Sequence, residues 1–248
     1  MGLKFLRVHP LSKPEDGPVS RYLNRYLSSF VSRLLLKTNV TPNQVSIAIS
    51  LFAIPILLSG LDGHIILAGF LFQLASTLDG VDGEIARAKN LNTPFGTILD
   101  TLLDYWIDSI GVLALGLALL KEGMFSATFV LSLVTFTVAI RLISQFVVKG
   151  VPNTKAHIYR DTRDVVTFLI FIGAMLTGLL ANSLWFVLAL LFVNAWRLDN
   201  MFYRLLVFWR LSSITLKITP KLVEESINIK ITTGEEILPE PKIGNGAI

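Results

Sequence analysis

The sequence contains no cysteine among its 248 residues. It can therefore form neither a disulfide nor a thiolate metal site. Charge is also scarce, because only 16% of the residues are Asp, Glu, Lys or Arg, whereas soluble globular domains carry about 25%. A cleavable signal peptide is not apparent, since no short apolar core ends at a small-residue cleavage site near the start. We expect the first apolar run to act as the insertion signal itself.

Hydrophobic residues make up 52% of the chain and gather in runs long enough to cross a bilayer, for which a helix needs about 20 residues. Six such runs lie at about 44–61, 64–86, 95–120, 123–148, 164–182 and 183–210. The predicted fold class is therefore all-α integral membrane, with six transmembrane helices.

An amphipathic helix should precede these spans. Within residues 19–36, apolar side chains fall on one line while Arg21, Arg25 and Ser28 fall off it. This pattern is typical of a helix that lies in the cytoplasmic membrane interface. The alternative is a soluble helix packed on the domain through its apolar face.

Three parts of the chain follow from these patterns. Residues 1–40 form a cytoplasmic leader with the interfacial helix, residues 41–211 form the six-helix membrane domain, and residues 212–248 form a cytoplasmic tail. We expect the tail to be mostly disordered, with a short strand at 227–233 as an option. At the start of the domain, Thr41 and Gln44 predict a capping box.

Basic residues give the orientation. Lysines and arginines gather before the first span, in the turn after the second, in the loop after the fourth and in the tail, whereas the opposite loops hold one lysine, Lys121. Both termini and the 87–95 turn should therefore be cytoplasmic. Basic residues placed this way fit anionic membrane lipid, and they do not fit nucleic acid.

Four aspartates border the second and third apolar runs, although a charge within a bilayer is costly unless it is paired or faces a wet cavity. Asp79 and Asp82 are three residues apart, and Asp100 and Asp104 are four apart. Each pair therefore shares one face of its helix. A short turn joins the two helices, so we expect antiparallel neighbours whose aspartates face each other.

A divalent cation would neutralise four facing carboxylates. Hard oxygen ligands favour Mg²⁺ or Mn²⁺, with Ca²⁺ as a further option. Four carboxylates can hold two ions about 4 Å apart, which suits in-line displacement at phosphorus. The alternatives are a structural ion site and aspartates that are paired to arginines.

Small residues and one arginine share these helix faces. Gly83 and Gly96 lack side chains, which leaves room for a ligand against the backbone, and Arg87 is one turn closer to the cytoplasm, where it suits a phosphate. Together with the aspartates they spell D-x2-D-G-x2-A-R-x8-G-x3-D-x3-D, from Asp79 to Asp104 without a departure. This pattern resembles the signature of the CDP-alcohol phosphotransferase (phosphatidyltransferase) family. The six spans, the amphipathic helix and the "TPN" at 41–43 are also similar to that family.

The resemblance implies a reaction and its site. An acceptor hydroxyl would attack the phosphorus that carries the CDP-linked alcohol, so that CMP leaves and a phosphodiester forms. The metal ligands would be Asp79, Asp82, Asp100 and Asp104, holding Mg²⁺ or Mn²⁺ as two ions. Asp104 would also be the general base. The nucleotide pocket would be formed by Asn43, Gly83, Ala86, Arg87 and Gly96.

The donor and the acceptor stay open. The leader at 13–35 is similar to the segment before the membrane domain in inositol-phosphate cytidylyltransferase fusions that make di-inositol phosphate. Donors to consider are thus CDP-inositol and a CDP-diacylglycerol-like lipid. If the acceptor is a phosphorylated alcohol, Arg141, Arg160 and Arg197 could bind its phosphate, although Arg141 could instead pair with Asp108 or reach toward lipid headgroups. The resemblance also implies a homodimer.

Two other classes compete with this hypothesis. Membrane prenyltransferases also use aspartates with Mg²⁺, but they have more spans and no reason for the A-R-x8-G interval. A divalent cation transporter would place its carboxylates near the bilayer midplane on opposed half-helices, whereas these cluster toward the cytoplasmic end.

Overall fold

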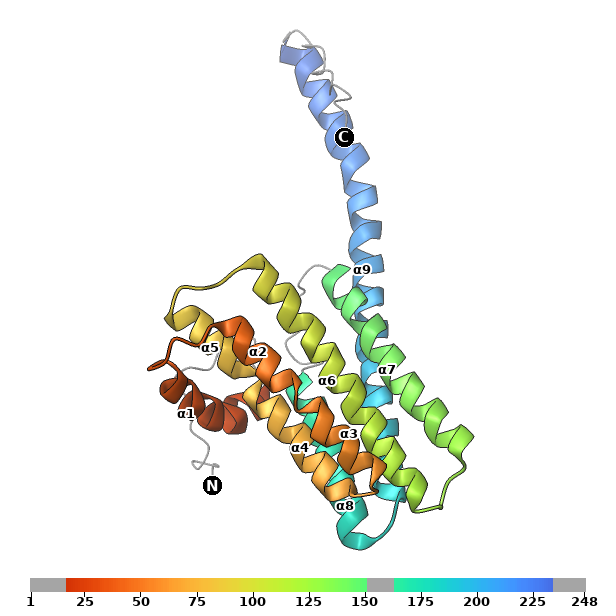
Figure 1. Cartoon of the computed structure of the whole chain (residues 1–248). Coiled ribbons are helices and arrows are strands. Elements are labelled where there is room, and N and C mark those ends of the chain that lie inside the picture. Colours follow the sequence, from red (N-terminus) through yellow and green to blue (C-terminus); the bar gives the residue numbers. More distant parts are fainter. Residues whose placement is uncertain (1–16, 151–162, 234–248) are drawn as a thin grey trace, which may run out of the picture. The chain divides into compact units, whose positions relative to one another are not determined.

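The computed structural model describes residues 17–150 and 163–233. Most of these residues are helical, and they contain no strand (Figure 1). The chain separates into two units, Met1–Phe202 and Tyr203–Ile248, and the account below concerns the first unless it says otherwise. The leader before residue 17, the loop with Arg160 and the last fifteen positions lie outside the described residues.

Six candidate membrane spans confirm the predicted fold class. They are Pro42–Leu61, Ile65–Ala88, Pro94–Lys121, Ala127–Ser144, Arg163–Leu180 and Leu184–Arg210. Each one is long and apolar enough to cross a bilayer.

The first two spans are each made of two helices. The first consists of α2 (Pro42–Ser50) and α3 (Ala53–Leu61). Pro55 explains the break between them, because it has no N–H to donate and its ring clashes with the carbonyl four residues earlier. The second consists of α4 (Ile65–Leu78) and α5 (Gly80–Ala88). Asp79 occupies the junction between these two helices.

The predicted cap at the first span is present, and the third span starts with a cap of the same kind. Thr41 and Gln44 form a capping box at the start of α2. Thr93 accepts a hydrogen bond from the backbone N–H of Gly96 at the start of α6 (Pro94–Lys121). The two caps fix the direction in which α2 and α6 leave the same side of the molecule.

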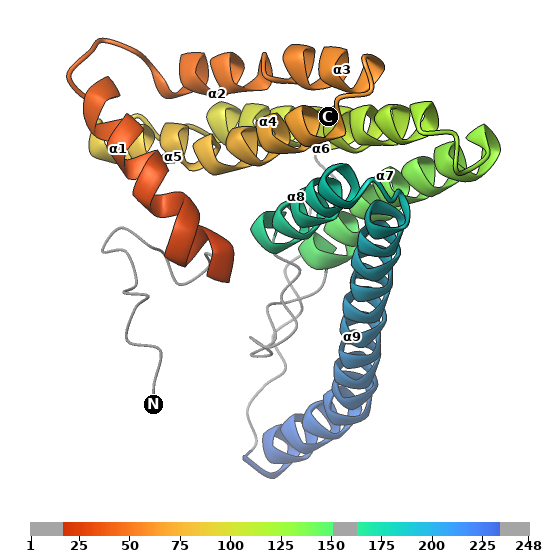
Figure 2. The same cartoon turned by 90° about the horizontal axis from the view of Figure 1, so that it is seen from below.

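The spans pack into one bundle around a dry core. Helix α6 lies against α3 and α7 (Ala127–Gly150), and α4 lies against α8 (Arg163–Leu180) (Figure 2). Phe72, Leu115 and Phe186 are fully buried in this core. At the contact between α3 and α6, a Cβ added to Gly60 would lie only 2.2 Å from a backbone oxygen of α6. Small residues allow such close helix contacts in membranes.

The predicted amphipathic helix is present, and its polar face is the buried one. A π-helical turn (Ser20–Asn24) leads into α1 (Arg25–Leu35), and Figure 2 shows α1 running across the ends of neighbouring helices. Its buried side chains are polar, namely Asn24, Arg25, Ser28, Ser29 and Ser32, while Leu23, Phe30 and Leu34 are more than half exposed. Apolar side chains that face outward fit the membrane interface and argue against a soluble helix packed on the domain.

The tail departs from the prediction. Helix α9 (Leu184–Thr233) continues into the stretch 212–248 that was expected to be mostly disordered, as far as the structure describes it, and residues 227–233 are helical, so the option of a strand there is wrong. Extending an existing helix avoids the cost of nucleation. In the sequence, Ile214, Ile218 and Leu222 also recur at the four-residue spacing of a helix.

Candidate active site

The four aspartates of the sequence pattern lie at the ends of two neighbouring spans. Asp79 occupies the α4–α5 junction, Asp82 lies in the first turn of α5, and Asp100 and Asp104 lie on consecutive turns of α6. Asp79, Asp100 and Asp104 each offer a carboxylate oxygen, and these three oxygens lie within 4.8 Å of one another. Three hard oxygen donors from two helices suit a divalent cation such as Mg²⁺ or Mn²⁺.

Asp82 is bound by a residue of the first span and lies near the other three aspartates. Ser46 of α2 donates a short hydrogen bond to its carboxylate, and the backbone N–H of Gly83 donates another. Both Asp82 and Asp100 line a cleft between α2, α5 and the start of α6. The structure therefore brings all four predicted metal ligands to one region.

Arg163 is the counter-ion of the acid cluster. Its Nη1 lies 2.7 Å from Oδ2 of Asp79 and 2.7 Å from Oδ1 of Asp104. These contacts use one oxygen of each carboxylate, so the donor set still fits a cation. They also bear out one of the alternatives, the pairing of aspartates with an arginine, for these two residues.

The cleft is open to solvent and has about 450 Å³ of empty space. Four of the five predicted nucleotide-binding residues line it: Asn43, Gly83, Ala86 and Gly96. A Cβ added at Gly83 would approach only Arg87, whose Nη1 lies 3.2 Å away, whereas one at Gly96 would meet Thr93 and Asn43. Glycine at Gly83 therefore keeps part of the cleft open. Arg87 is exposed and does not line the cleft, but it lies beside it.

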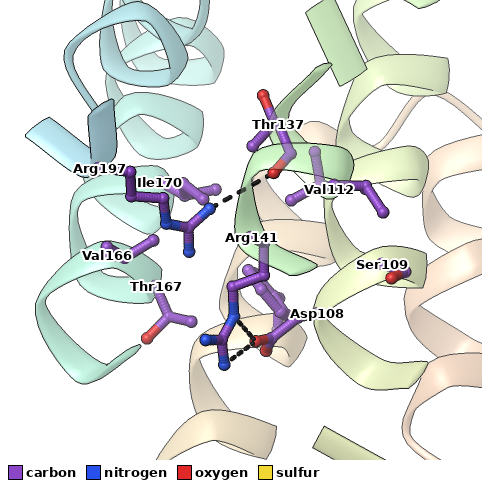
Figure 3. Close-up of a pocket in the computed structure, with 11 residues that line it drawn as sticks. Asp108, Ser109, Val112, Thr137, Arg141, Val166, Thr167, Ile170 and Arg197 are labelled. Carbon is purple, nitrogen blue, oxygen red and sulfur yellow. Dashed lines mark hydrogen bonds and ion pairs between the residues drawn. The ribbon is translucent and has the colours of Figure 1, made fainter. Parts of the chain in front are cut away.

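A second pocket, which we call the arginine pocket, is lined by residues of α4, α6, α7, α8 and α9 (Figure 3). It has about 300 Å³ of empty space, and its polar lining includes Asp108, Arg141 and Arg197. Nη2 of Arg141 lies 3.1 Å from Oδ2 of Asp108, so the alternative in which Arg141 pairs with Asp108 is confirmed. Nη1 of Arg197 lies 3.5 Å from the backbone oxygen of Thr137. The structure places these two predicted arginines in one pocket.

Sequence reasoning missed the role of Arg163. Besides Asp79 and Asp104, it contacts Asp108, with its Nε 3.0 Å from Oδ1. It therefore joins the acid cluster to the carboxylate of the arginine pocket. The only signal in the sequence was its place as the first residue of an apolar run after a basic loop, and that place is also typical of an arginine at a lipid headgroup.

Comparisons with known proteins bear on the family and the fold of the chain. The sequence profile of the CDP-alcohol phosphatidyltransferase family matches residues 39–211. The chain is 43% identical over 107 residues to the bifunctional IPC transferase and DIPP synthase of Thermococcus kodakarensis, a match that covers 43% of this chain and 24% of that protein. The matches thus span about a quarter of the length of these curated relatives.

Solved structures show the same fold. Phosphatidylinositol phosphate synthase of Mycobacterium tuberculosis with CDP-DAG bound aligns with a TM-score of 0.62 at 17% identity, covering 74% of this chain and 94% of that one. The same enzyme in complex with manganese and citrate aligns with a TM-score of 0.61 at 15% identity, covering 73% and 88%. Since the family profile spans most of the membrane domain and the family's acidic pattern is complete, this chain belongs to the CDP-alcohol phosphatidyltransferase family.

Proposed function

We propose that the chain transfers a phosphoalcohol group from a CDP-alcohol to an acceptor hydroxyl, with release of CMP. The acceptor oxygen forms a bond to the phosphorus that carries the alcohol, the bond from that phosphorus to the CMP oxygen breaks, and the hydroxyl proton passes to Asp104. The observation that carries the proposal is the order of residues on α6. Asp100 lines the cleft, Asp108 lines the arginine pocket, and Asp104 lies one turn from each.

This order gives the two substrates separate places. One helical turn rises about 5.4 Å, so a nucleotide in the cleft and an acceptor in the arginine pocket would meet near Asp104. Asn43, Gly83, Ala86 and Gly96 would contact the nucleotide, and Arg87 would reach its phosphates from the edge. Asp104 is within reach of a proton that leaves an acceptor hydroxyl between the two sites.

Asp79, Asp82, Asp100 and Asp104 would hold the divalent cation on which this family depends, and we propose Mg²⁺ or Mn²⁺, as two ions. Bound there, the ions would stabilise negative charge on the phosphate and on the leaving oxygen. The donor atoms present fit such ions, since three carboxylate oxygens already lie within 4.8 Å of one another.

We propose a phosphorylated polyol as the acceptor. Arg141 and Arg197 would bind its phosphate, because two guanidinium groups in one pocket suit an anion. Arg160, which lies outside the described residues, stays a candidate for the same role from the sequence. A similarity to bifunctional IPC transferase and DIPP synthases favours CDP-inositol as donor over a CDP-diacylglycerol-like lipid. The lipid donor is the second candidate, because the related fold with CDP-DAG bound shows that this architecture accepts one.

The basic residues support a cytoplasmic active site with both termini on that side, and we propose that the protein acts as a homodimer in the cell membrane. The decisive experiment is a screen of donors and acceptors with the purified protein and Mg²⁺, in which CMP release is measured. Release that requires both a CDP-alcohol and a phosphorylated acceptor is the expected result. A protein that binds no cytidine nucleotide would contradict the proposal, and metal uptake into vesicles would favour a transporter instead.

A further inference from the structure

Helix α5 presents two different faces to its surroundings. Asp82 and Glu84 are two residues apart, which places them about 200° apart around a helix of 3.6 residues per turn. Asp82 lies toward the cleft, where Ser46 and Gly83 bind it. Glu84 lies on the opposite side and faces α1. A rotation of α5 about its axis would therefore move both carboxylates together.

The face of α5 away from the cleft is fixed by a buried ion pair. Arg25 of α1 donates to Oε1 of Glu84 at 2.8 Å, and these side chains are only 7% and 5% exposed. Ser28 donates to the same oxygen at 3.0 Å. Gly80, one turn before Glu84, makes room for this contact, because an added Cβ would lie 3.2 Å from Nη1 of Arg25.

The end of α5 is held as well. Lys89, directly after the helix, donates to the backbone oxygens of Thr38 at 2.7 Å and Val40 at 2.9 Å. Those residues lie just before α2, which carries the other wall of the cleft. Glu84 is therefore tied to α1, and Lys89 is tied to the segment between α1 and α2.

We propose that Glu84, held by Arg25 and Ser28, is a positioning residue that sets the rotation of α5 and so aims Asp79 and Asp82 at the aspartates of α6. Helix α5 follows α4 after a break of one residue, Asp79, so the contacts that α5 makes with α1 and α2 help to decide where its side chains point beyond that break. A buried ion pair adds little stability compared with packed apolar residues, whereas it does require one geometry. The inference rests on the proposed function, since it assigns Asp79 and Asp82 to the metal.

The test measures Mn²⁺ binding and CMP release with the full chain in detergent. Glu84→Asp keeps the charge but shortens the side chain, and Glu84→Gln keeps the length but removes the charge. We expect both to weaken Mn²⁺ binding by roughly tenfold, the lower end of the loss seen when groups that orient metal ligands are changed. CMP release at limiting metal should fall in parallel and recover at high Mn²⁺. The charge exchange Arg25→Glu with Glu84→Arg should restore part of the affinity.

A matched control loosens α1 without touching α5. Asn24 accepts a hydrogen bond from Thr77 of α4 at 3.2 Å, so Asn24→Ala should lower the melting temperature yet leave the Mn²⁺ affinity close to that of the wild type. Wild-type affinity in both Glu84 variants, or an equal loss in Asn24→Ala, would overturn the inference while the proposed function stands. A wild-type protein that binds no Mn²⁺ would overturn both. If Glu84→Gln does not fold, Glu84→Asp alone decides.

Discussion

The cleft and the arginine pocket differ in how they are built. The cleft is lined by residues within 42–100 and by small side chains such as Gly83 and Gly96. The arginine pocket combines residues from 72 to 197, and its charges already contact one another, as Arg141 contacts Asp108. In an open cleft of small residues, a ligand can pack directly against the backbone. In a pocket of paired charges, a charged ligand must replace one member of an existing ion pair before it can bind. This difference suggests a common nucleotide on one side and a variable acceptor on the other.

The largest effect should come from the residue between the two sites. Asp104→Asn removes the proposed base, and we expect CMP release to fall at least about 10³-fold, within the range of general-base catalysis combined with a lost ligand. Binding of a CDP-alcohol, measured by calorimetry, should persist, because the cleft lining is unchanged. Loss of nucleotide binding in step with activity would mean that the two sites are not separate.

A substitution in the cleft should act on the donor alone. Gly83→Val places methyl groups where only Arg87 is near, so the fold should survive while the nucleotide is displaced. We expect kcat/KM for the donor to fall about 10²-fold, as for a misplacement of about 1 Å at a reacting centre, with the acceptor KM unchanged. Ala88→Leu, an exposed change on the same helix, is the control and should leave both substrates unaffected.

A substitution in the arginine pocket should act on the acceptor alone. Arg197→Met removes a guanidinium group that would donate to the acceptor phosphate, a loss of about 1.5–3 kcal/mol for a charged hydrogen bond. The KM for a phosphorylated acceptor should therefore rise at least tenfold, while the donor KM stays constant. An acceptor that lacks the phosphate should not distinguish the variant from the wild type. Equal effects on both acceptors would remove the phosphate from the proposal.

The smallest effect tests whether the cleft depends on local capping. Thr41→Ala removes the side-chain oxygen that accepts from Gln44 and should lower the free energy of unfolding by about 1 kcal/mol. Because Asn43 and Ser46 lie in the first turns of α2, the donor KM should rise slightly and the acceptor KM should not. Thermal melts and steady-state kinetics would measure both, and a rise in the acceptor KM would contradict the division of the two sites.

Much of this protein could be predicted because its signals are local in the sequence. The length and polarity of each run fix the spans, since lipid offers backbone groups no other partners. The spacing of three between Asp79 and Asp82 and of four between Asp100 and Asp104 places each pair on one helix face, and the capping box follows from Thr41 and Gln44, three residues apart. The helical tail was misread, because its pattern of polar and apolar residues is weak and the preceding helix extends into it.

The sequence by itself therefore determined the membrane class and the acidic pattern, and its family resemblance pointed to four of the residues that line the cleft. Only the tertiary structure decided that Arg163 bridges Asp79, Asp104 and Asp108, that Arg141 and Arg197 share a pocket, and that α1 buries its polar face. The physical reason is the distance along the chain between the residues that interact. Helix faces and caps are set by neighbours within one or two turns, whereas the partner of a buried charge is set by which helices pack side by side.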